Sequence, residues 1–181
     1  MIRITIPKME LFDEKTQQFS YIEEQTLELE HSLVSISKWE SKWCKAFLGK
    51  KDKTYEETLD YIRCMTLNPD VDPVMYNYLT DDNINEINNY IKAPMTASHI
   101  TTSDDNGKTN RDVVTSELIY FWMISLGIPF KCENWHLNRL LALIKVCNAK
   151  NSTPKKSNPK ALASKYAAMN AARRKQHNSR G

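Results

Sequence analysis

The spacing of the apolar residues changes after the first thirty positions, and this change constrains the fold more than any other sequence feature. Before it, Ile2, Ile4 and Ile6 alternate with polar residues, and residues 19–30 keep the same period of two. Alternation of this kind predicts strands that bury one face. We therefore expect two or three short antiparallel strands in this segment.

After these strands, apolar residues recur every three or four positions, which predicts a series of helices. Thr54 and Glu57 form a capping box, and Ser32 and Thr80 each precede a helical period. Pro73 suits the first turn of a short helix. The expected helices cover residues 32–47, 54–66, 73–79, 80–93, 113–126 and 133–148.

The segment Val113–Leu126 is apolar almost all round, so we expect it to be the central helix of the core. Gly127 suits the end of this helix, and Pro129 prevents it from resuming. The next helix then faces it across the turn. The side chains expected at the hydrophobic centre are Leu118, Phe121, Trp122, Leu137, Leu141 and Ile144.

Charge is divided unevenly along the chain. Residues 151–181 carry eight basic residues and no acidic one, which gives +8. The other 17 basic residues and all 22 acidic residues precede them, which leaves −5 for residues 1–150. Dense like charge resists burial and is typical of an interaction arm. Lys160–Gln176 is rich in alanine and predicts a helix that is marginal in water until a partner binds it.

These patterns predict a mainly α protein with a compact helical body, a short N-terminal antiparallel β element and a basic C-terminal helical tail. Residues 1–30 form the β element and residues 31–150 the body of the same domain, while residues 151–181 form the arm. Residues near 95–111 lack an apolar period and are expected to be an exposed loop. Residues 151–159 are expected to be a linker.

The spacing of reactive residues favours neither an enzyme nor a cofactor or metal site. The four histidines are isolated in sequence, and the four cysteines include no C-x-x-C pair. We interpret the cysteines as small, reduced, partly buried side chains. Glu117 could be a buried acid with a raised pKa, but a carboxylate at the start of a helix more commonly serves the helix dipole. No catalytic residue, metal or cofactor is therefore expected.

Two groups of residues are candidates for binding a partner. Trp39 and Trp43 share a helical face beside Lys38 and Lys42, which favours core packing but leaves a partner-binding patch as the alternative. The arm could follow a phosphate backbone or dock on a protein through its alanine face. The candidate residues of the arm are Lys165, Tyr166, Arg173, Arg174 and Lys175.

The sequence gives no sign of a membrane segment or an export signal. The most apolar stretch, Leu118–Leu126, is too short to cross a bilayer. Charged residues interrupt the amino-terminal segment, which does not resemble a signal peptide. We expect the protein to remain in the cytosol of the cell that makes it and not to contact a membrane.

Several strings of residues resemble a known family. They are LEHSLVSISKWESKW (29–43), TLDYIRCMT (58–66), TSELIYFWM (115–123), WHLNRLLALIKVCN (135–148) and the basic finish NAARRK (170–175). These strings are similar to a family encoded in the structural-gene clusters of long-tailed phages, over nearly the whole chain. Its members are usually taken to be tail assembly chaperones.

The resemblance implies a protein of virion morphogenesis in the cytoplasm of an infected bacterium. Such chaperones coat the tape-measure protein and bring tail-tube subunits to it. These two proteins are therefore the expected partners, and a second copy of the chain is a further candidate. A helical body with a solvated acidic outside and an apolar groove suits this task. The alternative is a structural component of the head, neck or tail, and a nucleic-acid-binding accessory protein is third. Nucleic acid is the less favoured partner.

Overall fold

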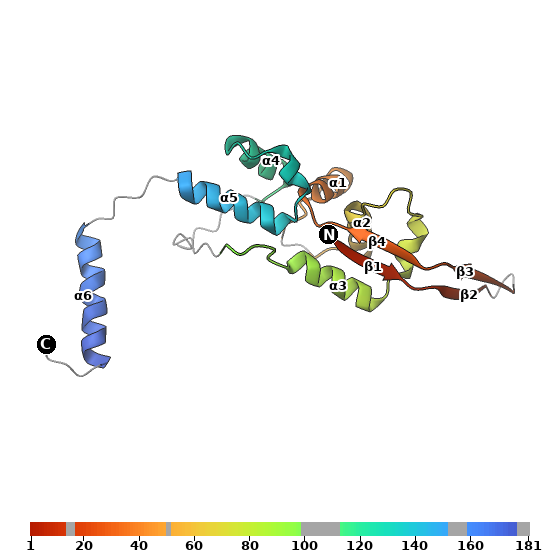
Figure 1. Ribbon diagram of the computed structural model, residues 1–181, viewed down its shortest axis with the longest axis horizontal. Helices are drawn as coiled ribbons and strands as arrows, with labels where there is room; N and C mark the ends of the chain where they lie inside the picture. Colours follow the sequence, from red (N-terminus) through yellow and green to blue (C-terminus); the bar gives the residue numbers. More distant parts are fainter. Residues whose placement is uncertain (14–16, 50–51, 99–112, 152–158, 177–181) are drawn as a thin grey trace. The chain divides into compact units, whose positions relative to one another are not determined.

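The protein is mainly α, with a short antiparallel β ribbon at its N-terminus (Figure 1). It divides into two compact units, Met1–Ala149 and Lys150–Gly181. Most of the loop predicted near residues 95–111, and residues 152–158 of the predicted linker, lie outside the described residues. The computed structural model describes residues 1–13, 17–49, 52–98, 113–151 and 159–176.

The N-terminal strands form one long hairpin with a constant register. β1 pairs with β4 and β2 pairs with β3, so that Ile2 lies opposite Leu29 and Asp13 opposite Gln18. The hairpin has four strands instead of two or three because each arm is interrupted, at Pro7 in the first arm. The strands are β1 (Ile2–Ile6), β2 (Met9–Asp13), β3 (Gln18–Ile22) and β4 (Gln25–Leu29).

The inner half of the hairpin, β1 and β4, buries one face. Alternate side chains of these two strands point into the body, as the period of two predicts. The four fully buried ones are Ile4, Ile6, Leu27 and Leu29. This part of the ribbon therefore belongs to the hydrophobic core.

The helices of the first half begin where their capping residues predict. The Ser32 side chain accepts the Ser35 N–H in the first turn of α1, and Thr54 and Glu57 form the capping box of α2. Thr80 and Asn83 form a second capping box at α3. Each cap satisfies N–H groups that have no partner within the helix. The elements are α1 (Leu33–Trp43), α2 (Tyr55–Met65), η1 (Pro73–Tyr78, a 3-10 helix) and α3 (Asp81–Lys92).

The chain that follows α2 closes the outer edge of β4. The Glu30 N–H donates to the Met65 carbonyl at 2.9 Å, and the Leu67 N–H donates to the Glu28 carbonyl at 2.8 Å. The Glu28 N–H donates to the Asn68 side-chain oxygen at 2.6 Å. The backbone of β4 is therefore hydrogen-bonded on both sides.

The second half of the chain contains α4 (Ser116–Ser125), η2 (Phe130–Asn134, a 3-10 helix), α5 (Leu137–Asn151) and α6 (Pro159–Gln176). Gly127, which follows the C-cap residue Leu126 of α4, adopts a φ of 63°, in line with its predicted role as a helix end. In the described part of the chain, no helix combines the length and hydropathy needed to span a membrane.

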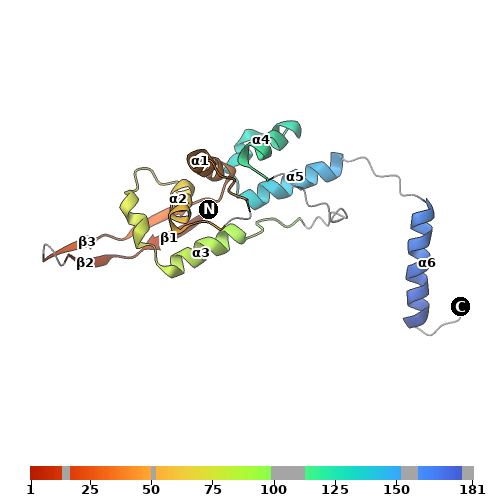
Figure 2. The same cartoon turned by 180° about the vertical axis from the view of Figure 1, so that it is seen from behind.

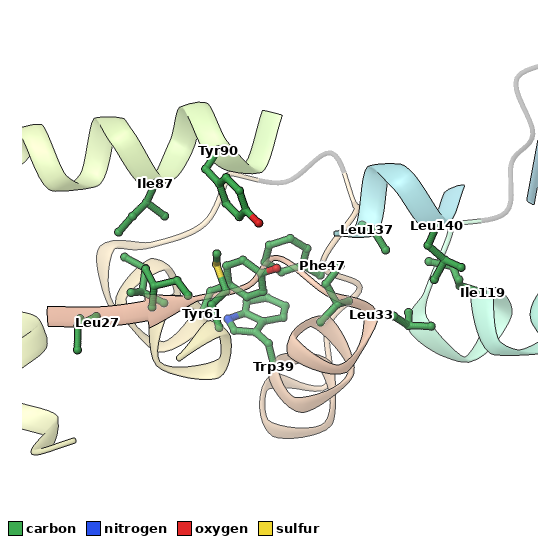
Figure 3. Close-up of a cluster of buried hydrophobic side chains, with 14 of the residues drawn as sticks. Leu27, Leu33, Trp39, Phe47, Tyr61, Ile87, Tyr90, Ile119, Leu137 and Leu140 are labelled. Atoms are coloured by element: carbon green, nitrogen blue, oxygen red, sulfur yellow. The ribbon is translucent and has the colours of Figure 1, made fainter. Parts of the chain in front are cut away.

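The core is centred on the β ribbon, α1 and α2 (Figure 3). Trp39, Phe47 and Tyr61 pack together there, with ring centroids 5.2 Å apart for Trp39 and Phe47 and 4.0 Å apart for Phe47 and Tyr61. α3 contributes Ile87 to the same cluster, and α4 contributes Ile119. Contacts distant in sequence therefore join both halves of the body.

The prediction that α4 is the central helix is wrong. Leu137 and Ile144 of the expected centre are buried, but Phe121 is 60% exposed. α4 packs against α1, and its buried side chains include Ile119 and Met123. A helix that is apolar all round gives no pattern from which to choose its inner face. The other residues of the expected centre are only partly buried: Leu118, Trp122 and Leu141.

Candidate functional site

Trp39 is a core side chain. It is 1% exposed, and its indole N–H donates to the Glu57 backbone carbonyl at 2.9 Å. Figure 3 shows the ring turned toward Phe47 and Tyr61. Trp39 therefore stabilises the packing of α1 against α2 and is out of reach of a partner.

Trp43 is more accessible than Trp39. Its indole N–H donates to the Asp60 carboxylate at 2.8 Å, and the ammonium groups of Lys42 and Lys45 lie 5.9 and 5.6 Å from its ring centroid. α1 ends at this residue, earlier than predicted, because Cys44 adopts a left-handed conformation with a φ of 51°. Trp43 is therefore the member of the pair that a partner can contact.

Two buried carboxylates of α2 pair with lysines at the C-terminal end of α1 and just after it. Glu57 pairs with Lys45 at 2.5 Å, and Asp60 pairs with Lys42. The hydrogen bond from Lys45, followed by that from the Thr54 backbone N–H, keeps the pKa of Glu57 below its usual value. These pairs fix α1 against α2. The residues that line a depression of about 190 Å³ beside them are Lys42, Trp43, Glu56, Asp60 and Arg63.

Glu40 joins three segments of the body through one buried carboxylate. Its Oε1 accepts the Phe47 N–H at 2.7 Å, and its Oε2 accepts the Ser116 N–H, also at 2.7 Å. Ser116 is the first residue of α4, where negative charge is favourable. The sequence interpretation assigned no role to Glu40, although its place on the inward face beside Trp39 was the available signal.

His31 and His136 are distant in sequence but lie together in the fold, with ring centroids 5.1 Å apart. His31 Nδ1 forms a hydrogen bond with the Tyr61 hydroxyl. His136 Nδ1 accepts the Asn138 N–H at 3.2 Å, so its Nε2 carries the proton and donates to the Tyr90 carbonyl at 3.0 Å. Burial, and next the neighbouring His136, lowers the pKa of His31 to about 3. Because both rings are buried, we assign the pair a structural role.

Glu117 does not have the raised pKa of a buried acid. Hydrogen bonds from its own backbone N–H and then from the Thr115 hydroxyl lower the pKa of its exposed carboxyl. Within the described ranges, histidine, cysteine, aspartate and glutamate side chains form no group of three or more that could hold a metal ion.

An exposed apolar surface, here called the α4 face, consists of Phe121, Ile124 and Phe130. Phe121 and Ile124 are 60% and 63% exposed and lie one helical turn apart on α4. Phe130 of η2 is also more than half exposed, and its ring lies 6.3 Å from that of Tyr120 on α4. The sequence interpretation missed this surface because it placed Phe121 in the core.

The outer half of the hairpin, β2 and β3, presents a second group of exposed apolar side chains. Phe12, Phe19 and Tyr21 are each more than half exposed, and the rings of Phe12 and Phe19 lie 4.9 Å apart. Lys8 pairs with Glu23 at 3.2 Å at the base of this outer half. In Figures 1 and 2 the outer half projects past the helices of the body.

The second unit contains the candidate residues of the arm on one helix. Tyr166, Arg173 and Arg174 are exposed on α6, which also contains Lys165 and Lys175. Every α6 side chain for which the structure describes burial is exposed. The unit is therefore a basic helix that buries none of these side chains.

The described surface thus offers three candidate partner sites: the α4 face, the outer half of the hairpin and α6. Trp43, at the end of α1 beside α2, is a smaller candidate site for a partner. Compared with protein-family models, with curated proteins and with solved structures, the chain matches none of them.

Proposed function

We propose that this protein is a phage tail assembly chaperone and not an enzyme. It binds the tape-measure protein and helps to recruit tail-tube subunits in the cytoplasm of the infected cell. The resemblance of the sequence strings supports this function. The structural observation that carries it is the exposed α4 face.

The α4 face has the chemistry required to cover an apolar helix. Exposed apolar patches on soluble proteins commonly mark interaction sites. Phe121 and Ile124 are neighbours on the helix surface, and Phe130 of η2 lies beside Tyr120, which is one turn before Ile124. Full burial of each such side chain contributes about 1.5–3 kcal/mol. A tape-measure helix laid along this face gains that free energy and is kept from aggregating.

The basic C-terminal arm supplies a second contact in this proposal. Residues 151–181 carry +8, and Tyr166, Arg173 and Arg174 are exposed on α6. A basic helix of this kind suits an acidic segment of a partner, and the attraction weakens as salt screens it. The arm acts together with the α4 face and does not replace it.

Coexpression with the tape-measure protein tests the role of the α4 face. Phe121→Glu and Ile124→Glu should abolish copurification and leave the tape-measure protein insoluble, because each places a charge where an apolar contact is required. Val74→Glu is the matched control, since Val74 is also an exposed apolar side chain but lies on η1. Circular dichroism establishes that all three variants are folded. Wild-type binding by both α4 variants would exclude this face.

Purified particles separate the chaperone from its alternatives. Mass spectrometry of finished virions should find the protein absent or far below one copy per tail subunit. Stoichiometric recovery would assign it to the virion structure instead. Retention on immobilised DNA that falls steeply with salt would favour the nucleic-acid-binding function.

A further inference from the structure

Along the outer edge of the hairpin, the segment after α2 hydrogen-bonds at β4 but not at the fully described residues of β3. At β4, backbone groups of Met65 and Leu67 hydrogen-bond to that edge. For Phe19, Tyr21 and Ile22, the β3 residues that the structure describes in full, no backbone hydrogen bond comes from outside the hairpin. Unpaired strand edges are templates for pairing with another strand.

The two edges of the outer hairpin differ in charge. β2 has the sequence MELFD and carries Glu10 and Asp13, whereas β3 has the sequence QFSYI and carries no charge. Charged residues on an edge strand oppose association with a further strand, and β3 has none. Its aromatic and β-branched residues also favour a strand. The β3 edge is therefore the one suited to accept another strand.

The face beside this edge carries three exposed aromatic side chains, with Glu10 opposite Tyr21 and the Lys8 ammonium 6.0 Å from the Tyr21 ring. Because the register is constant and side chains alternate, the face that carries Ile6 and Leu27 in the inner half carries Phe12, Phe19 and Tyr21 in the outer half. The inner residues are buried, but the three aromatic residues are exposed. A two-stranded ribbon is only marginally stable in water, and additional strands with an apolar face stabilise it.

We propose that β3 pairs with β3 of a second copy of this chain, antiparallel and centred on Ser20. The result is a four-stranded sheet in the order β2, β3, β3, β2. This register sets Phe19 opposite Tyr21 of the second copy, and the two-fold symmetry repeats the pair. The acidic β2 strands then lie at the outside of the sheet, where their repulsion is least.

Self-complementarity selects a second copy as the occupant. Two identical uncharged strands meet without like charges, and the antiparallel arrangement joins aromatic residue to aromatic residue. Because both hairpins also carry acidic residues, salt should maintain or strengthen the association, the opposite of its effect on an acidic-to-basic contact. This inference is independent of the proposed function, since it uses neither the α4 face nor the arm.

Sedimentation equilibrium of the full chain tests the association. An interface of this size is small, so we expect a monomer of 21.0 kDa to convert to a dimer between about 10 µM and 1 mM. Phe19→Lys should weaken dimerisation about tenfold or more. Phe12→Lys is the matched control, because Phe12 lies opposite Phe19 in the ribbon but on β2. A wild-type chain that stays monomeric throughout this range overturns the proposal.

Disulfide trapping tests the register. Ser20 of β3 and Leu11 of β2 lie opposite each other in the ribbon. The variants Ser20→Cys and Leu11→Cys are compared in a Cys44→Ser background, because Cys44 is exposed and could itself form a crosslink. Oxidation should crosslink the Ser20→Cys variant into a dimer and leave the Leu11→Cys variant monomeric. Equal crosslinking of the two variants, or crosslinking of Leu11→Cys alone, would exclude β3-to-β3 pairing.

Discussion

The Glu40 carboxylate accepts the backbone N–H of Ser116 at 2.7 Å, so a side chain of α1 holds the first turn of α4. The other oxygen of the same carboxylate accepts the N–H of Phe47. Both bonds are buried, where a polar group without a partner is costly. One side chain thereby fixes α4 and the loop after α1.

Glu40→Gln should destabilise the protein by about 1–3 kcal/mol, because an amide oxygen accepts one N–H while its NH₂ group faces the other. Glu86→Gln on α3 is the control, since Glu86 is exposed and should tolerate the change. Urea unfolding monitored by tryptophan fluorescence measures both. Equal losses for the two variants would contradict the assigned role of Glu40.

Leu140 and Leu141 form a matched pair of adjacent leucines on α5. Leu140 is fully buried, whereas Leu141 is only partly buried. Leu140→Ala should cost about 2–5 kcal/mol of unfolding free energy, and Leu141→Ala should cost less. Chemical denaturation of both variants checks the order. A larger loss at Leu141 would restore the core expected from the sequence.

The buried histidine pair should make the fold sensitive to acid. The folded-state pKa of His31 is about 3, so the unfolded chain binds this proton more tightly. The free energy of unfolding is therefore unaffected by protonation of His31 above pH about 6.5. It decreases as the pH falls from about 6.5 toward 3, by at most about 1.4 kcal/mol per pH unit for each histidine. Burial also lowers the pKa of His136, which adds to the same trend.

His31→Gln removes one titrating group and should flatten the dependence of stability on pH between about 5 and 6.5, above the range in which most carboxylates titrate. Urea unfolding at several pH values measures this slope for the variant and the wild type. The variant should be less stable near pH 7 because its hydrogen bond with Tyr61 changes. An unchanged slope would show that His31 is not the responsive group.

Truncation after Asn151 should leave the thermal midpoint of the body nearly unchanged, because the described α6 side chains are all exposed. The truncated protein should bind its partner more weakly, and the difference should be largest at low salt. Calorimetry and binding at two salt concentrations measure these effects. A large fall in the midpoint would make the arm part of the core, and unchanged binding would remove its proposed role.

Local signals in the sequence predicted much of the fold. The side chains that cap a helix lie within a few residues of the groups they satisfy, so Ser32, Thr54 and Thr80 marked the starts of α1, α2 and α3. Alternation also placed the buried isoleucines of β1 correctly. These features depend on neighbours along the chain and are visible without tertiary structure.

Features that depend on distant contacts could not be read in the same way. α4 is apolar on all sides, and tertiary contacts, among them the packing against α1, determine which of its side chains are buried. The contact of His31 with His136 and the bond from Glu40 to Ser116 join segments with no shared sequence pattern. The candidate surfaces were therefore the part least accessible from sequence.

The constant register of the hairpin limits how this protein can vary in evolution. A single residue gained or lost near Pro7 would turn the side chains beyond it to the opposite face unless a bulge absorbed the change. Changes of length should therefore be concentrated at the tip of the hairpin, while the spacing between Ile6 and Met9 is kept. Chains that share this architecture should differ in the length of the outer half of the hairpin and should keep the length of its inner half.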